Sequence, residues 1–294
     1  MVNTHILTQE FEYFEPRTID EAVKYLTDYG EKAKVIAGGT DLLVQMKMGK
    51  AYPQYLIHIS RIPSLRYLIE EKGLRIGALT PFRDLERSQV IKEKYTALFE
   101  AARSVSSVQI KTMGTVGGNL CNASPAADAA PPLIAFGAKV KLTGLGRENV
   151  LPLEKFFIGP GKTILSPMEI LVEIQVPELK GNLGSAFLKL GRVSADLAKV
   201  SCGVVIERED GVCRMCRIVL GSVAERPMRA LEAEELITDE KLTEELVEKA
   251  GREASEEIRP ITDIRSTTQY RKEISRILVR DAILIAWRRA GEEA

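Results

Sequence analysis

Apolar side chains recur at helical spacing between residues 18 and 30 of the chain. Thr18 stands where a helix N-cap is expected, and Glu21 follows three residues later, which is the pattern of a capping box. Gly30 is a typical residue just beyond the end of a helix. The pattern therefore predicts a helix over this segment.

Alternating or short apolar runs bounded by turn residues predict a series of strands. These runs are residues 34–36, which lead into Ala37 and two glycines, and residues 54–60, 73–80, 137–144, 185–191, 198–208 and 212–221. Further helical patterns cover residues 91–105, 124–136, 228–237, 242–258 and 268–290. The helix over 124–136 is expected to begin at Ser124, followed by Pro125, because serine at the N-cap and proline at the first helical position favour that start.

Residues 166–176 begin like a helix but alternate like a strand. The alternating apolar positions are Ile170, Val172, Ile174 and Val176. Strict alternation predicts a strand, because successive side chains of a strand point to opposite faces. Leu171 is then expected on the opposite face, together with the polar residues Glu173 and Gln175.

The chain of 294 residues suggests about two domains, at roughly 150 residues each. We place the boundary in the polar, glycine-containing stretch 178–184 that follows Pro177. Beyond it, strands come first and helices last, which indicates an α+β arrangement.

Composition narrows the possible functions. The 41 basic and 41 acidic residues balance, which argues against a sequence-independent nucleic-acid binder. No apolar run reaches the roughly 18 residues of a membrane span, and the N-terminal stretch does not read as a signal peptide. Four scattered cysteines do not form a disulfide framework, so we expect a cytoplasmic protein. The two histidines, His5 and His58, are expected to be neither catalytic nor metal ligands, so chemistry would belong to a bound cofactor.

Two turns rich in glycine are the main candidates for ligand binding. Residues 37–43 read AGGTDLL directly after a predicted strand, and residues 112–120 read TMGTVGGNL. Glycine allows close approach to the backbone, and successive N–H groups can form a concave site for an anion. Two such turns could hold the two phosphates of a dinucleotide. The alternative is that both are ordinary hairpin turns.

Other familiar motifs are rejected. The first strand is not followed by G-x-G-x-x-G, and the GPGKT segment at 159–163 has Phe156 where a phosphate-binding loop needs glycine. Cys213 and Cys216 lie on a predicted strand, where residues three apart point to opposite faces and cannot share a metal ion. We therefore expect neither a metal site nor an iron–sulfur cluster in this chain.

Three further residues allow either a structural or a functional interpretation. Asp128 lies in the first turn of the helix predicted to begin at Ser124, where an acid interacts well with the helix dipole, or it accepts hydrogen bonds from ligand hydroxyls. Lys189 is either a surface lysine or a cation beside a ligand that becomes anionic. Cys121 follows the second glycine turn and is either a small buried residue or part of the site.

Six segments, taken together, resemble the FAD-binding medium subunit of molybdenum hydroxylases, the group that includes carbon monoxide dehydrogenase and xanthine dehydrogenase. They are VIAGGTDLL (35–43), QIKTMGTVGGNLCNASPAAD (109–128), ILSPMEILVEIQVP (164–177), AFLKLGRVSADLAKVS (186–201), GSVAERPMRA (221–230) and DIRSTTQYRKEISRILVRDAIL (263–284). They occur in the order typical of the family and span nearly the whole chain.

The resemblance implies an α+β fold. Residues 1–178 would form an FAD-binding domain of the vanillyl-alcohol oxidase and MurB type, in two subdomains of about 1–60 and 61–178. Residues 184–290 would form a C-terminal domain with an antiparallel sheet and a helical bundle.

The resemblance also implies which residues contact FAD, while no side chain is expected to be catalytic and none to bind a metal. The first turn would wrap the pyrophosphate, the second would hold the phosphates and ribityl chain, and Leu171 and Lys189 would lie near the flavin ring. The implied cofactor-binding residues are Val35, Ile36, Ala37, Gly38, Gly39, Thr40, Asp41, Leu42, Thr115, Val116, Gly117, Gly118, Asn119, Asp128, Leu171 and Lys189.

The implied function is that of an oxidoreductase subunit, in which FAD receives electrons from 2Fe–2S clusters of a small subunit and passes them to NAD or another acceptor. A large subunit would carry the molybdopterin, and a dimer of heterotrimers is the expected assembly. Two alternatives are a self-sufficient FAD-dependent oxidase or reductase and a non-catalytic assembly protein on the same fold.

Overall fold

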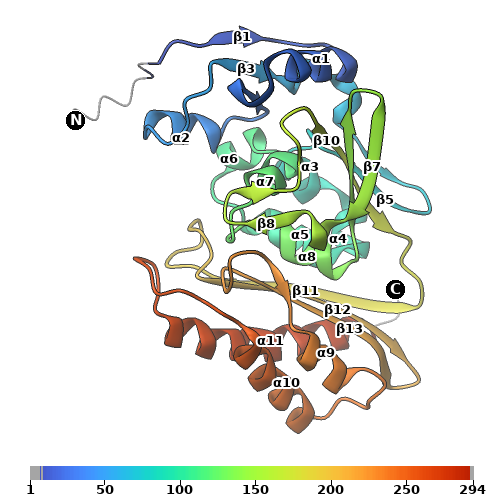
Figure 1. Ribbon diagram of the computed structural model, residues 1–294. Helices are drawn as coiled ribbons and strands as arrows, with labels where there is room; N and C mark the ends of the chain where they lie inside the picture. The colour runs from blue at the N-terminus through green and yellow to red at the C-terminus, as the bar shows by residue number, and fades with distance from the viewer. Residues whose placement is uncertain (1–6, 8, 292–294) are drawn as a thin grey trace.

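The computed structural model describes residues 7 and 9–291 and contains four sheets with helices packed around them (Figure 1). Among the predicted features, His5 lies outside the described residues. In this part of the chain, no helix is long and apolar enough to cross a bilayer.

A small parallel sheet with the strand order β1-β3-β2 forms the N-terminal layer, at the top of Figure 1. Its elements are β1 (Glu12–Phe14), α1 (Ile19–Tyr29), β2 (Ala33–Ile36), α2 (Leu42–Lys47) and β3 (Tyr55–His58). The predicted helix start is confirmed, because Thr18 Oγ1 accepts a hydrogen bond from Glu21 N over 3.1 Å. The side chain of Glu21 accepts from Arg17 N, one residue before the position that a capping box requires.

The middle layer is an antiparallel sheet with the order β4-β5-β10-β6-β7 and a group of short helices. Its strands are β4 (Leu68–Glu70), β5 (Gly73–Gly77), β6 (Lys139–Gly144), β7 (Arg147–Pro152) and β10 (Ile170–Pro177). Its helices are α3 (Phe82–Arg87), α4 (Gln89–Lys94), α5 (Thr96–Ser104), α6 (Val108–Met113), α7 (Val116–Asn122) and α8 (Ala130–Ala135). A separate hairpin, β8 (Phe157–Gly159) and β9 (Lys162–Thr163), contains the GPGKT segment, which is therefore not a phosphate-binding loop leading into a helix.

Two helix predictions in this layer need correction. The expected helix over 91–105 is broken at Tyr95, whose backbone leaves the helical region and whose buried ring packs edge-on against Phe136 with centroids 5.5 Å apart. The helix expected to begin at Ser124 begins six residues later. Ser124 Oγ instead accepts a hydrogen bond from Ala126 N in a turn, so the side chain competes with helix formation.

The C-terminal layer is an antiparallel sheet with one helical side (Figure 1). Its elements are β11 (Asn182–Leu190), β12 (Val200–Glu209), β13 (Val212–Gly221), β14 (Met228–Arg229), α9 (Leu231–Ile237), α10 (Glu244–Glu257) and α11 (Thr268–Arg289). The helices α9, α10 and α11 cover one face of this sheet, and α5 and α8 of the middle layer pack against it from the other side. The apolar core of the middle layer therefore continues into the C-terminal sheet through Phe187, Val205 and Val219.

Two β-bulges overturn expectations that rest on simple alternation. In β10 the extra residue is Val172, so Leu171 points to the same core as Ile174 and Val176 rather than to the polar face. In β13 the extra residue is Arg214, so Cys213 and Cys216 lie in one buried cluster instead of on opposite faces. A bulge inserts one residue into the ladder and shifts the alternation beyond it.

Candidate functional site

The first glycine turn connects β2 to α2, and its backbone donors find no acceptor in the part of the chain that the structure describes. Residues 37–40 are half-buried, and Gly39 adopts a φ of +71°, a conformation that favours glycine. Among the described residues, no carbonyl or side chain accepts a hydrogen bond from the N–H groups of residues 38–42. Consecutive unpaired N–H groups followed by a helix are a suitable site for a phosphate.

The second glycine turn leads into α7, and its backbone donors are already paired. The hydrogen bonds run from Val116 N to Thr80 O (3.0 Å), from Gly117 N to Ala78 O (2.9 Å) and from Gly118 N to Thr115 Oγ1 (3.0 Å). Thr115 is thus the N-cap of α7, and Gly117 lies so close to the backbone of Ala78 that a Cβ on it would be 2.6 Å from the carbonyl oxygen. This turn therefore joins α7 to the sheet layer instead of presenting a row of free amides.

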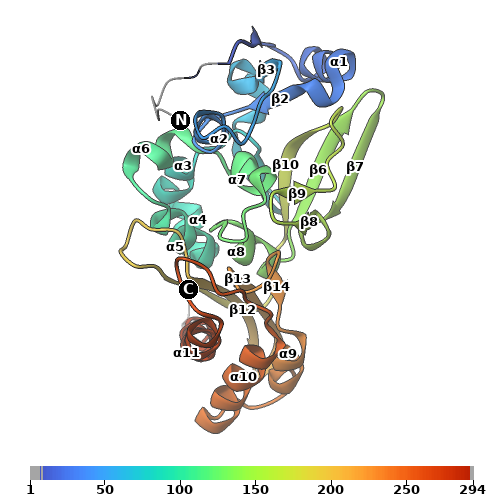
Figure 2. The same ribbon diagram turned by 60° about the vertical axis from the view of Figure 1, so that its left-hand side comes forward.

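The two turns are in direct contact although about 75 residues separate them in the sequence. A Cβ on Gly38 would lie 1.8 Å from Met113 O, and one on Gly114 would lie 3.5 Å from Thr40 Oγ1. Gln45 of α2 also donates a hydrogen bond to Asn122 of α7 over 3.0 Å. In both ribbon views α7 lies between α2 and α8, so the second turn supports the first (Figure 2).

Asp128 lies in the turn before α8, not in a helix, and it is 6% exposed. Its Oδ2 accepts a hydrogen bond from Lys189 Nζ over 2.9 Å, while its Oδ1 has no partner among the described residues. Burial raises the pKa of Asp128 to about 6, although the neighbouring ammonium of Lys189 acts in the opposite direction. Asp128 precedes the N-cap of α8 and so does not lie in the first turn of a helix.

Lys189 projects from β11 and is buried, which excludes the surface alternative. Besides Asp128, its ammonium donates to Ser104 O over 3.2 Å. The turn that carries Asp128 is linked to the second glycine turn, because Asn119 Oδ1 accepts a hydrogen bond from Ala129 N over 3.4 Å. The two glycine turns, Asp128 and Lys189 thus form one connected region at the centre of the molecule.

Leu171 and Cys121 belong to or border the core of the middle layer. Leu171 is 3% exposed and pairs across the sheet with Leu142. Burial raises the pKa of Cys121 to about 12, so this residue stays a neutral thiol at physiological pH.

The remaining sequence candidates lie away from this region. His58 ends β3 and shares a surface cluster in which its Nδ1 is 2.6 Å from Tyr13 Oη and 3.3 Å from Glu15 Oε1. Cys213 donates to Met215 O over 3.5 Å within the buried cluster that also contains Cys216. Within the described residues, no three His, Cys, Asp or Glu side chains gather in an arrangement suited to a metal ion.

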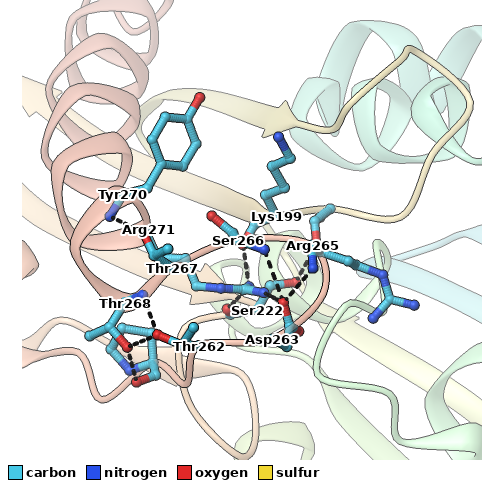
Figure 3. A network of polar contacts seen from close by, with 12 residues as sticks. Lys199, Ser222, Thr262, Asp263, Arg265, Ser266, Thr267, Thr268, Tyr270 and Arg271 are labelled. Carbon is cyan, nitrogen blue, oxygen red and sulfur yellow. Dashed lines mark hydrogen bonds and ion pairs between the residues drawn. The ribbon is translucent and has the colours of Figure 1, made fainter.

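Arg271 is a buried residue that the sequence analysis did not single out. Its Nη1 donates to Lys199 O and to Ser222 O, each over 2.6 Å, and its Nη2 donates to Asp263 Oδ1 over 2.9 Å (Figure 3). These bonds hold the start of β12 and the segment after β13 against α11. Only the structure reveals this role, because each partner comes from a different part of the chain.

Comparison with known families identifies the two halves of the chain. Residues 9–179 match the family described as "FAD binding domain in molybdopterin dehydrogenase". The chain belongs to this family. Residues 185–286 match the "CO dehydrogenase flavoprotein C-terminal domain". The resemblance found in the sequence is thereby confirmed, and the chain is an FAD-binding medium-type subunit of an oxidoreductase of the molybdenum hydroxylase group.

Individual relatives are similar over nearly their full length. The carbon monoxide dehydrogenase medium chain of Hydrogenophaga pseudoflava is 33% identical, with 97% of this chain and all of the relative covered. The xanthine dehydrogenase FAD-binding subunit of Escherichia coli O157:H7 is 29% identical, with 95% of this chain and 97% of the relative covered.

A solved structure supports the same assignment. The carbon monoxide dehydrogenase from Hydrogenophaga pseudoflava that lacks the Mo-pyranopterin moiety contains a chain that matches with a TM-score of 0.94 and 35% identity. The match covers 97% of this chain and 99% of that one. The mixed helix-and-sheet fold, with an FAD-binding part followed by a C-terminal part, is confirmed.

Proposed function

We propose that this chain is the electron-transfer subunit of a heteromeric molybdenum hydroxylase and that its described glycine turns, Asp128 and Lys189 hold FAD. Electrons would arrive from 2Fe–2S clusters on a small subunit, after a large subunit with molybdopterin has oxidised the substrate. The electrons would then pass to NAD or another acceptor. When bound, FAD supplies the exchange between single electrons and electron pairs.

The observation that carries this proposal is the row of N–H groups at residues 38–42, which have no acceptor among the described residues. Backbone donors at the start of a helix suit the pyrophosphate of a dinucleotide, and they need no positively charged side chain. Val35 and Ile36 position this turn at the end of β2, and Ile36 is buried beneath it. The second turn, from Thr115 to Asn119, supports the first, and its half-buried residues Gly118 and Asn119 would face the ribityl chain of the cofactor.

Asp128 and Lys189 fit the polar end of such a ligand. Asp128 Oδ1 is a buried acceptor without a partner among the described residues, which is the kind of atom that a ligand donor satisfies. The ammonium of Lys189, whose side chain is only 7% exposed, places a positive charge beside it, where charge interactions are stronger than in water. Leu171 belongs to the core of the middle layer, and the resemblance implies that it would lie near the flavin ring.

The proposal also covers the domain organisation of the chain, the assembly of the complex and its location in the cell. Residues 1–178 would form the FAD-binding domain of the vanillyl-alcohol oxidase and MurB type, with subdomains of about 1–60 and 61–178, and residues 184–290 the C-terminal domain. The complex would be a cytoplasmic dimer of heterotrimers. The family matches on either side of residues 180–184 support this division.

Cofactor analysis of the purified protein tests the proposal. We expect the chain to bind FAD and to show a flavin absorption band, and the native complex to contain molybdenum and iron. A chain without this band, even after FAD has been added, would contradict the proposal and favour an assembly protein. Steady-state turnover of a small substrate by the isolated chain would instead favour a self-sufficient oxidase or reductase.

A further inference from the structure

Lys189 begins a row of residues that crosses three strands of the C-terminal sheet. It lies directly opposite Ser201 of β12, and Ser201 lies directly opposite Gly221 of β13. Residues directly opposite each other in antiparallel strands project from the same face. Lys189 and Ser201 therefore point to the same side of the sheet.

The turn that carries Asp128 covers this row. A Cβ on Gly221 would lie 2.5 Å from Ser201 Oγ, 3.2 Å from Pro131 Cγ and 3.5 Å from Pro125 O. Asp128 lies between these two prolines in the sequence and binds Lys189 directly. Ser201 thus faces the same segment as Lys189, with the small Gly221 beside it.

Two buried polar atoms lack hydrogen-bond partners among the described residues: Ser201 Oγ on this face of the sheet and Asp128 Oδ1 in the turn that covers it. Ser201 is 1% exposed and Asp128 is 6% exposed, so bulk water does not readily satisfy either of them. Lys189 has three N–H donors, and the hydrogen bonds to Asp128 and Ser104 use two of them. Unpaired buried polar atoms are costly and are rare in native proteins unless a ligand or an ordered water pairs with them.

These three groups supply a specific combination of hydrogen bonds. The hydroxyl of Ser201 and the remaining N–H of Lys189 can donate, and Asp128 Oδ1 accepts when it is ionised. The pyrimidine edge of a flavin ring presents two carbonyl oxygens with one N–H between them. Two donors and one acceptor are the complement of that edge.

We propose that Ser201 is a further flavin-binding residue, which together with Asp128 and Lys189 binds the carbonyl and imide edge of the isoalloxazine ring. This inference rests on the proposed FAD function and names the part of the cofactor that this end of the site recognises. Donors at the carbonyl edge also stabilise the negative charge that the ring gains on reduction.

The position of Ser201 is fixed by its surroundings. Arg271 holds the carbonyl groups of Lys199 and Ser222, which lie close to Ser201 and Gly221 on the two neighbouring strands (Figure 3). In Figure 3, the Lys199 side chain extends away from this network, on the side of Tyr270. The start of β12 is therefore held through its backbone, which keeps Ser201 in place before the ligand binds.

The test compares FAD binding and flavin potential in the full-length chain. We expect Ser201→Ala to raise the FAD dissociation constant about five- to tenfold, as for one lost hydrogen bond, and to make the midpoint potential more negative. Ser201→Thr keeps the hydroxyl and is expected to restore both values. Ser185→Ala is the matched control, because Ser185 lies on the same face of β11 and its hydroxyl is already paired with Ala97 N.

A second measurement uses the wild-type chain alone. FAD methylated at N3 lacks the central N–H of the edge, and we expect it to bind at least tenfold more weakly than FAD. If wild type binds FAD but Ser201→Ala leaves both affinity and potential unchanged, or if N3-methyl-FAD binds as well as FAD, the inference is wrong and the proposed function stands. If wild type binds no FAD, both are wrong.

Discussion

The two glycine turns look alike in the sequence and differ in what their backbones do. Residues 38–42 keep their N–H groups unpaired within the described chain, whereas Val116, Gly117 and Gly118 donate to Thr80, Ala78 and Thr115. The first turn is free to bind an anion, and the second builds the support on which the first rests. Glycine is required in both places, but in the second it permits the close packing of one backbone on another.

The largest effect is expected where the two turns touch. Gly38→Ala would place a Cβ 1.8 Å from Met113 O, so one of the turns must move. Such overpacking costs about 3 kcal/mol, and we expect FAD binding to be lost as well. Gly159→Ala is the control, because a Cβ there meets no atom within 4 Å. Urea unfolding and FAD titration of both variants measure the difference, and FAD binding by Gly38→Ala with wild-type affinity would contradict the contact.

The variant Gly117→Ala should distinguish the role of the second turn in stabilising the fold from a role in binding FAD. Its Cβ would lie 2.6 Å from Ala78 O, and we expect the free energy of unfolding to fall by about 2 to 3 kcal/mol. FAD affinity of the fraction that remains folded should change much less, because the N–H of Gly117 is paired within the chain. Equal stability but weaker FAD binding would show that Gly117 itself contacts FAD, and not only Gly118 and Asn119 of this turn.

The acid that borders the second turn gives a pH dependence. The pKa of Asp128 is raised to about 6 by burial, while an unfolded aspartate titrates near 4. The native state therefore binds more protons than the unfolded state in this window, so stability falls as pH rises from about 4 to 6, by on the order of 2 kcal/mol. Asp128→Asn removes the titrating group, and its unfolding free energy should be flatter over the same range. If the free energy of unfolding changes equally steeply with pH in wild type and in Asp128→Asn, a group other than Asp128 causes the pH dependence.

The smallest effect is expected at the cap of α7. Thr115→Ala removes the oxygen that accepts from Gly118 N and should cost about 1 kcal/mol, while Thr115→Ser should retain most of the stability. Thermal unfolding of the apoprotein compares the two. If Thr115→Ala weakens FAD binding more than it weakens the fold, its hydroxyl contacts the cofactor and the comparison of the turns needs revision.

Local features of the fold were predictable from the sequence, and features that depend on distant partners were not. The cap at Thr18 involves neighbouring residues only and is found as expected. The strand before the first turn is also found, over Ala33–Ile36, because its own residue pattern marks it in the sequence, although its pairing with β3 is not marked there. The bulges at Val172 and Arg214 depend on pairing with β6 and β12, which alternation along one strand cannot reveal.

The candidate site shows the same division. Its glycine turns, Asp128 and Lys189 stand out by residue type, but the burial of Lys189 depends on Asp128, which is 61 residues away. The pairing of the second turn depends on Ala78 and Thr80, which carry no signal of their own. Ser201 is one polar residue in a buried strand. What distinguishes it as a candidate for ligand binding is that its hydroxyl has no hydrogen-bond partner among the described residues, which the sequence cannot reveal.

Amide hydrogen exchange tests the central comparison most directly. In the chain without FAD, the amides of residues 38–42 should exchange rapidly, and those of Val116, Gly117 and Gly118 slowly. Addition of FAD should protect the first group and leave the second nearly unchanged. Protection that appears at the second turn, with none at residues 38–42, would contradict the account.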